Sequence, residues 1–107
     1  MSDFLNQILE RRAKLNEVRE AIKARRSEPY LHCVEVHLRS IIISKTLGKA
    51  GVNPMTALPL MRALAEMSSY MVLQCFPNIK AHTPEANKLM TDINADARMI
   101  LEIMRAP

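Results

Sequence analysis

Residues 83–105, TPEANKLMTDINADARMILEIMR, contain the most regular hydrophobic pattern of the chain. The apolar stripe consists of Ala86, Met90, Ile93, Ala97, Ile100 and Met104. These residues alternate spacings of four and three, which place them on one face of an α-helix. Thr83 can cap this helix, and Pro84 has no N–H group that the first turn would leave unpaired. The stretch therefore predicts an amphipathic helix over residues 84–105.

The polar side of the same helix carries two pairs of opposite charges. Lys88 and Asp92 are four residues apart, and so are Arg98 and Glu102. Side chains with this spacing are neighbours on a helix surface. We therefore expect two ion pairs on the outer side of the helix.

Three more helices are predicted before this one, over residues 3–26, 29–48 and 56–76. Prolines and the two glycines of the chain, Gly48 and Gly51, separate them. Gly51 is placed to adopt the left-handed conformation that commonly ends a helix. The connections are short, so we expect neighbouring helices to pack nearly antiparallel.

Residues 33–39 are an ambiguous segment. Val34, Val36 and Leu38 alternate with polar residues, as they would in a β-strand. A helical projection accounts for more of the sequence, because it gathers a larger set of apolar residues on one face. That set consists of Tyr30, Leu31, Val34, Leu38, Ile41 and Ile42. We interpret the segment as helical, with the strand as the alternative.

The third helix is predicted to begin at Thr56, although Asn53 is a second candidate for its cap. A start at Thr56 places Pro59 in the first turn, where proline is tolerated. The residues expected to face inward are Leu60, Leu64, Met67, Met71 and Phe76 or residues near them.

These patterns predict an all-α fold, a four-helix bundle-like single domain. The chain has 107 residues, of which 49% are hydrophobic, enough for the core of one domain. Along the first helix, Ile8, Leu15 and Ile22 repeat every seven residues and form a narrow stripe typical of coiled coils. Because this stripe and that of the last helix both suit a second copy, we expect a homodimer.

The sequence contains no segment typical of membrane insertion. Its longest aliphatic run, at residues 41–43, is far shorter than a membrane span. The N-terminus lacks the basic and apolar regions of a signal peptide. Two cysteines, Cys33 and Cys75, are too few for a disulfide framework. We expect a soluble, cytoplasmic protein with reduced thiols and no membrane partner.

Positive charge is concentrated in residues 11–26. This stretch has seven basic and two acidic residues, a net charge of +5, whereas the whole chain carries +4. Such asymmetry indicates an acidic partner. Arginine suits bidentate binding of protein carboxylates, and the same cations could neutralise nucleic-acid phosphates. A solvated helix face is the third interpretation.

Cys33 and His37 lie one helical turn apart, and Ser40 and Ser44 continue the same stripe. A thiol beside a base can act as a nucleophile. No orienting group or glycine-rich oxyanion site accompanies this pair, however. The alternative is a stripe of small residues that lets another helix approach closely. We predict no catalytic residues.

Metal and nucleotide sites have no sequence support. The histidines and cysteines lack the CxxC, HxxxH and HExxH spacings of zinc sites. The glycine-containing segment 48–51 is too short for a P-loop. Residues 42–64 have the outline of a helix-turn-helix, but Arg62 is the single charged residue in segment 54–64, where a recognition helix needs polar groups. We predict no metal and no cofactor.

The function that we expect is that of a small non-enzymatic regulatory or adaptor protein. It would bind another protein through the basic first helix; the alternative is a nucleic-acid-binding protein that uses the same helix. Three methionines of the third helix are also expected to contact the partner, because soft thioethers suit an adaptable groove. The residues expected to contact the partner are Arg11, Arg12, Arg19, Lys23, Arg25, Arg26, Met61, Met67 and Met71.

Overall fold

The computed structural model describes residues 2–105, which form four α-helices. These are α1 (Ser2–Arg25), α2 (Glu28–Lys49), α3 (Pro54–Cys75) and α4 (Pro84–Arg105). The described residues contain no strand, and segment 33–39 lies within α2, so the all-helical prediction is confirmed. None of the four described helices combines the length and the hydropathy that a membrane crossing requires.

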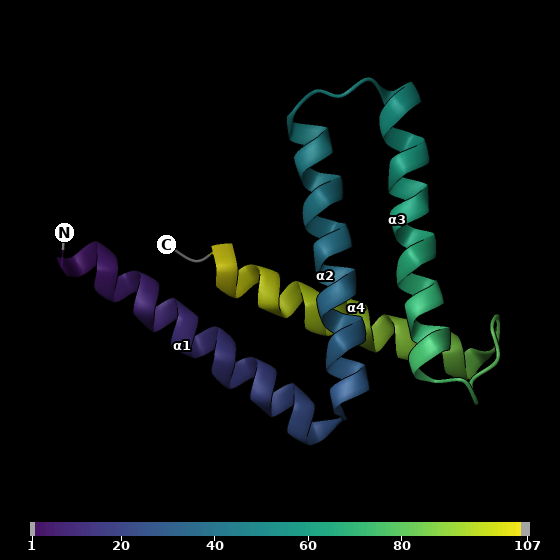
Figure 1. Cartoon of the computed structure of the whole chain (residues 1–107), viewed down its shortest axis with the longest axis horizontal. Coiled ribbons are helices and arrows are strands. Elements are labelled where there is room, and N and C mark those ends of the chain that lie inside the picture. Colours follow the sequence, from purple (N-terminus) through teal and green to yellow (C-terminus); the bar gives the residue numbers. More distant parts are fainter. Residues whose placement is uncertain (1, 106–107) are drawn as a thin grey trace.

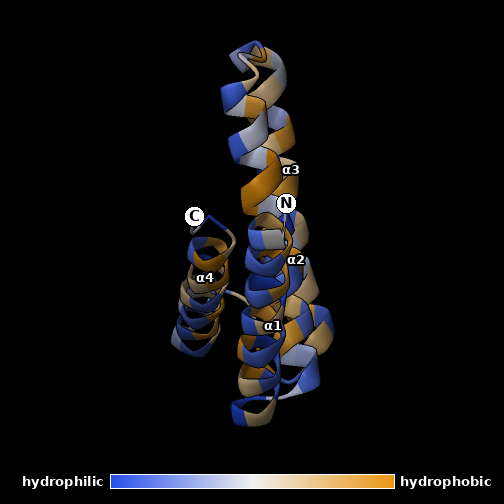
Figure 2. Cartoon of the chain, turned by 90° about the vertical axis from the view of Figure 1, so that its left-hand side faces the viewer, coloured by the Kyte–Doolittle hydropathy of each residue, from blue (hydrophilic) through white to orange (hydrophobic). Residues whose placement is uncertain are grey.

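The helices are arranged in two layers (Figures 1 and 2). In Figure 1, α1 and α2 form a V, α3 runs antiparallel beside α2, and α4 crosses behind α2. Helix α4 also contacts α1. The resulting molecule is flat, with extents of 50 × 41 × 17 Å. Its radius of gyration of 15.8 Å exceeds the value of about 13 Å for a compact domain of this length.

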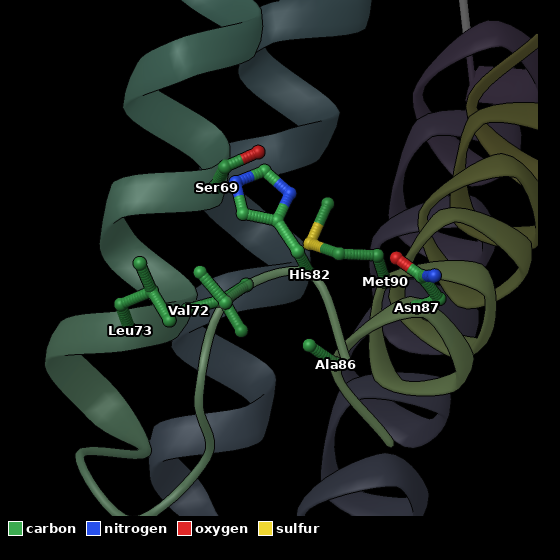
Figure 3. A pocket seen from close by; sticks show the side chains of 8 residues that line it. Ser69, Val72, Leu73, His82, Ala86, Asn87 and Met90 are labelled. Carbon is green, nitrogen blue, oxygen red and sulfur yellow. The ribbon is translucent and has the colours of Figure 1, made fainter. Parts of the chain in front are cut away.

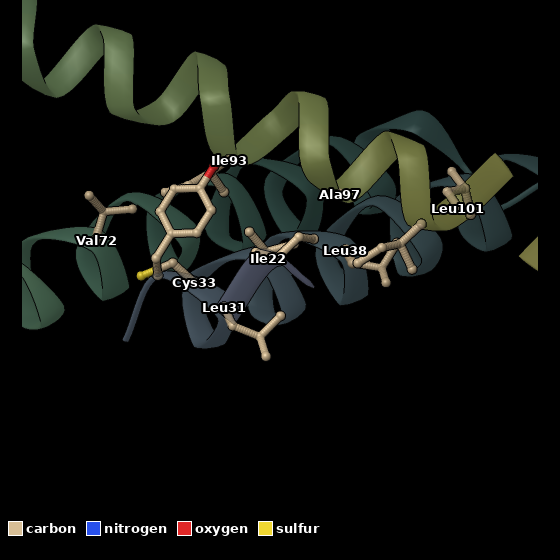
Figure 4. Packing of buried hydrophobic residues seen from close by; sticks show 11 residues of the cluster. Ile22, Leu31, Cys33, Leu38, Val72, Ile93, Ala97 and Leu101 are labelled. Atoms are coloured by element: carbon tan, nitrogen blue, oxygen red, sulfur yellow. The ribbon is translucent and has the colours of Figure 1, made fainter. Parts of the chain in front are cut away.

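The core lies where α4 crosses the other layer (Figure 4). The predicted stripe of α4 supplies Ile93 and Ala97, which are both fully buried, and Ile100. Helix α2 contributes Val34 and Leu38, both from the predicted apolar face. Helix α2 therefore lies at the centre of the fold, with α4 on one of its sides and α3 on another.

Polar caps set the beginnings of α2 and α4. The Ser27 hydroxyl accepts a hydrogen bond from the Tyr30 N–H at 3.1 Å, and the Thr83 hydroxyl accepts one from the Ala86 N–H at 3.2 Å. Each cap satisfies a backbone donor that the first turn leaves without a helical partner. After α2, Gly51 has the expected left-handed conformation, with a φ of 69°.

Helix α3 begins earlier than predicted, at Pro54 and not at Thr56. The side chain of Asn53 caps it by accepting a hydrogen bond from the Met55 N–H at 2.9 Å. Pro59 consequently lies inside the helix and cannot donate the usual bond to the Met55 carbonyl. The outer position of Pro59, which is exposed, allows solvent to satisfy that carbonyl.

The predicted inner face of α3 is partly wrong. Leu60 and Met67 are exposed, whereas Ala57, Ser68 and Val72 are buried. Apolar residues occur on every side of this helix, so periodicity alone could not identify the packed side. Of these buried residues, Ser68 faces α2, where its hydroxyl contacts the His37 ring.

The heptad stripe of α1 is buried only toward its C-terminal end. Ile22 is 2% exposed and Leu15 is partly buried, but Ile8 is 43% exposed. In Figure 1 the N-terminal turns of α1 extend away from α2. We call residues 3–14 the α1 arm.

Candidate functional site

The C-terminal half of α1 presents its arginines to carboxylates of the same chain. The Arg19 guanidinium donates from Nε and from a terminal nitrogen to the Glu35 Oε1, at 3.2 and 2.9 Å. Arg25 lies 3.2 Å from both carboxylate oxygens of Asp96. Two of the predicted partner-binding arginines therefore attach α1 to α2 and α4.

Arg26 also pairs within the chain, with Asp92 of α4. This hydrogen bond raises the pKa of the Arg26 guanidinium. Arg26 and, secondly, Lys88 hold the pKa of the Asp92 carboxyl below its usual value. Lys88 and Asp92 form the predicted i,i+4 pair at 3.2 Å. Arg26 is thus a structural link between α1 and α4.

Tyr30 completes this network from the first turn of α2. Its ring is buried, and the Arg26 guanidinium lies 4.6 Å from the ring centroid. The Tyr30 hydroxyl donates to the Asp96 carboxylate at 2.5 Å. Burial first, and this hydrogen bond second, raise the pKa of Tyr30 well above its ordinary value.

The network was not predicted from the sequence, although one signal was present. Asp92 and Asp96 are four residues apart on α4, next to Lys88, and could be recognised as an acidic face. The pairing of that face with Arg25 and Arg26 requires the crossing of α1 and α4, which sequence spacing does not encode.

Two of the other three predicted cations of α1 face outward. Arg12 and Lys23 are exposed, and so is their neighbour Lys14; none of the three has an ion pair within residues 3–105. Arg11 is partly buried. Two of the outward cations, Arg12 and Lys14, lie on the α1 arm.

The α1 arm also exposes large apolar side chains. Phe4 is 66% exposed, and Leu5, Ile8 and Leu9 are exposed as well. These four residues occupy adjacent positions over the first turns of the helix. The arm therefore combines an uncovered apolar surface with cations, and it is a candidate surface for binding a macromolecule.

The three predicted methionines do not share one groove. Met61 lines a cavity between helices, Met67 is exposed, and Met71 packs against the core. Met67 and Met71 lie one turn apart on α3, but Met71 packs against the core whereas Met67 stays in solvent. An adaptable methionine surface on α3 would thus rely on Met67 alone of these three.

A polar cluster joins α2, α3 and α4. The His37 Nδ1 lies 2.8 Å from the Ser68 Oγ, and the His37 Nε2 lies 2.9 Å from the Asn94 Oδ1. With the ring proton on Nε2, the ring donates to Asn94 and accepts from the Ser68 hydroxyl. Ser68 is only 3% exposed, so this arrangement holds three helices together and gives the hydroxyl little access to a substrate.

His37 does not pair with Cys33. Both of its ring nitrogens contact other residues, and the Cys33 thiol lies 3.9 Å from the Met71 carbonyl, to which it can donate. Burial, followed by the neighbouring Cys75 thiol, raises the pKa of Cys33 to about 12. A thiol with a raised pKa is a poor nucleophile, so the thiol–base interpretation of this pair is not supported.

The same stripe fits the small-residue interpretation. The Ser40 hydroxyl lies 3.4 Å from the Leu64 carbonyl of α3 and 3.3 Å from the Val36 carbonyl of its own helix. A backbone atom of α3 can come this close to α2 only where the intervening side chain is small. Ser40 therefore permits close packing of the two helices.

One cavity, of about 140 Å³, lies between α3 and α4 (Figure 3). Its walls include Val72 and Leu73 of α3 and Met90 of α4, and His82 enters it from the connecting loop. The loop reaches this position with a φ of 63° at His82. Apolar side chains dominate the walls, so the cavity offers little for polar recognition.

A second cavity, of about 240 Å³, is lined by residues of α2, α3 and α4. Lys45 and Arg98 lie at its walls together with Met61. Arg98 does not form the predicted ion pair with Glu102 in the described part of the chain. Within that part, no group of three metal-ligating side chains is placed to hold an ion.

Comparison with known proteins places the chain in no family. A scan of protein-family models finds no match. Searches of curated proteins and of solved structures also find none. Any function proposed for the chain must therefore rest on its surfaces, ion pairs and packing.

Proposed function

We propose that the chain is a non-enzymatic regulatory or adaptor protein that binds another protein through α1. The observation that supports this proposal most strongly is the α1 arm, where Phe4, Leu5, Ile8 and Leu9 are exposed together. Full burial of such a side chain from water is worth about 1.5–3 kcal/mol, and these four are between 43% and 66% exposed. A covering partner would recover part of this free energy.

The partner that fits the arm is a helix-binding groove with an acidic rim. An amphipathic helix binds such a groove through apolar residues spaced three and four apart, as Phe4, Ile8 and their neighbours are. Arg12 lies one turn after Ile8 on the same side of the helix, whereas Lys14 projects from the opposite side; neither has an ion pair in residues 3–105. Carboxylates at the rim of the groove would pair with Arg12, and Lys14 would add to the positive charge of the arm.

The role of the other α1 arginines is different in this proposal. Arg19, Arg25 and Arg26 pair with carboxylates of the same chain, so they hold α1 at a defined angle to α2 and α4. Their contribution to binding would be to orient the arm. Lys23 lies between these arginines in sequence and remains exposed.

Affinity capture with matched variants tests the proposal. The variants are Leu5→Ser with Leu9→Ser, and Arg12→Glu with Lys14→Glu; Lys49→Glu, at the exposed end of α2, is the control. A specific protein partner should be retained by the native chain and the control but lost with both double variants. Identical sets of captured proteins for all four chains would reject the α1 arm as the binding surface.

Nucleic acid is the alternative target, favoured by the exposed cations of α1. Fluorescence anisotropy of labelled duplex DNA and structured RNA, at about 50 and about 200 mM salt, separates the two possibilities. Binding to phosphates should weaken by orders of magnitude at the higher salt and depend on Arg12 and Lys14. It should not depend on Leu5 and Leu9, because aliphatic side chains do not contact phosphates favourably. Such a result would replace the protein partner with nucleic acid.

A further inference from the structure

Helix α3 has an uncovered outer side that is unusually apolar. It contacts mainly α2, and its sequence PMTALPLMRALAEMSSYMVLQC contains one base and one acid. Met55 is 82% exposed, Leu58 59% and Tyr70 62%. A shallow, open depression on this side is lined by α3 residues alone, from Arg62 to Leu73. We call this side the outer face of α3.

The two charges of the outer face lie symmetrically about Leu64. Arg62 precedes Leu64 by two residues and Glu66 follows it by two. Both side chains are exposed, and neither has an ion pair within residues 3–105. In an antiparallel pair of α3 helices related by a two-fold axis near Leu64, Arg62 of each copy would face Glu66 of the other.

The apolar residues of the outer face follow the same symmetry. Leu58 and Tyr70 lie six residues on either side of Leu64, and Met55 and Leu73 lie nine residues on either side. At 100° per residue, these four side chains project on the same side of the helix as Arg62 and Glu66. In the antiparallel pair, Met55 of one copy would therefore meet Leu73 of the other along the centre of the interface, and Leu58 and Tyr70 would lie along its two opposite edges.

We infer that the outer face of α3 binds a second copy of this chain in an antiparallel, two-fold symmetric dimer. A parallel arrangement would place Arg62 against Arg62 and Glu66 against Glu66, which like-charge repulsion disfavours. A different protein would not require residues that complement each other about Leu64. The paired helices would run together over about 33 Å, since each contains 22 residues that rise about 1.5 Å apiece.

This inference is independent of the partner proposed for the α1 arm. The outer face of α3 includes none of residues 3–14, so variants in one surface leave the other unchanged. A dimer through α3 would carry two α1 arms on one particle. An adaptor with two arms gains avidity for a partner that presents two binding sites.

Charge reversal tests the dimer directly. Size-exclusion chromatography with light scattering measures the mass of the particle in solution. A protein concentration of about 100 μM lies above the dissociation constants of typical interfaces. The native chain should have twice the monomer mass of 12.1 kDa. Arg62→Glu and Glu66→Arg should each weaken dimerisation at least tenfold, because each creates two like-charge contacts. Arg39→Glu, at an exposed position of α2, is the control and should remain dimeric.

Mixing the two single variants provides the decisive result. Two acidic faces repel and two basic faces repel, but an acidic face complements a basic one, so an equimolar mixture should recover the dimer mass. The double variant R62E/E66R should also dimerise, with circular dichroism confirming that every variant remains helical. A native chain of monomer mass, dimeric single variants, or a mixture that stays monomeric would each overturn the inference.

Discussion

Individual residues decide what the arginine-rich helix can do. Arg25 and Arg26 resemble a binding site in the sequence, but in the fold they pair with Asp96 and Asp92 of the same chain. Solvent-accessible ion pairs of this kind stabilise a fold only weakly. Their main effect is to fix where α1 crosses α4 and to reduce the positive charge available to a partner.

The Asp92 ion pairs predict a pH-dependent contribution to stability. The pKa of Asp92 is lowered in the folded state by Arg26 and Lys88. A lowered folded pKa stabilises the protein above the unfolded value of about 3.9. This contribution is lost as the pH falls through the folded pKa. Asp92→Asn should therefore destabilise the protein at pH 7.

Urea denaturation of the native chain and of Asp92→Asn, at neutral and at acidic pH, checks this prediction. The gap between their free energies of unfolding should begin to shrink below pH about 4, where the unfolded state binds the proton, and should close below the lowered folded pKa of Asp92, where both states bind it. Glu20→Gln, on an exposed residue of α1, should show no such gap. A gap that persists or grows in acid would contradict the assigned role of Asp92.

Among the elements, α2 organises the fold because it touches all three other helices. Its His37 contacts Ser68 of α3 and Asn94 of α4. His37→Ala would leave the buried Ser68 hydroxyl without its partner. We expect this change to lower the free energy of unfolding by about 1–3 kcal/mol. Chemical denaturation monitored by circular dichroism measures the loss.

The matched control for His37 lies on the same helix. His32 is exposed, so His32→Ala should change the free energy of unfolding by no more than about 0.5 kcal/mol. If both alanine variants lose the same free energy of unfolding, the hydrogen bonds of His37 with Ser68 and Asn94 add nothing to stability, and the loss reflects only the missing imidazole ring.

The elements also differ in how far their buried sides could be predicted. Helix α4 has charged and apolar residues on opposite sides, so the burial of Ile93 and Ala97 follows from spacing alone. Helix α3 has apolar residues all round, and neither the burial of Val72 nor the exposure of Met67 could be derived. Periodicity identifies a face only where polar residues mark the other one.

For the whole molecule, the flat shape leaves most of the α1 arm exposed to solvent. Residues 3–10 are all exposed, whereas Ile22 near the other end of the same helix is buried. Helical hydrogen bonds without tertiary packing open readily. We expect backbone amides of residues 7–12 to exchange with deuterium at least about tenfold faster than those of residues 19–25.

Hydrogen exchange with mass spectrometry can compare these two segments of one helix. Amides of the α2 core segment around Val34, which is fully buried, provide the slow reference. Uniform protection along α1 would contradict the described exposure of the arm. Selective slowing of residues 7–12 on addition of a captured partner would locate its binding surface.

The local sequence pattern specifies the four helices, because proline, glycine and capping residues mark their ends to within about two residues and hydrophobic spacing marks their interiors. It also determined the packed stripes of α2 and α4, and the Lys88–Asp92 pair, all of which depend on local spacing. The tertiary structure alone decided that Arg19, Arg25 and Arg26 face carboxylates of the same chain. It alone also decided which side of α3 is uncovered. Both outcomes depend on how helices cross, and crossing is set by contacts between residues far apart in the chain.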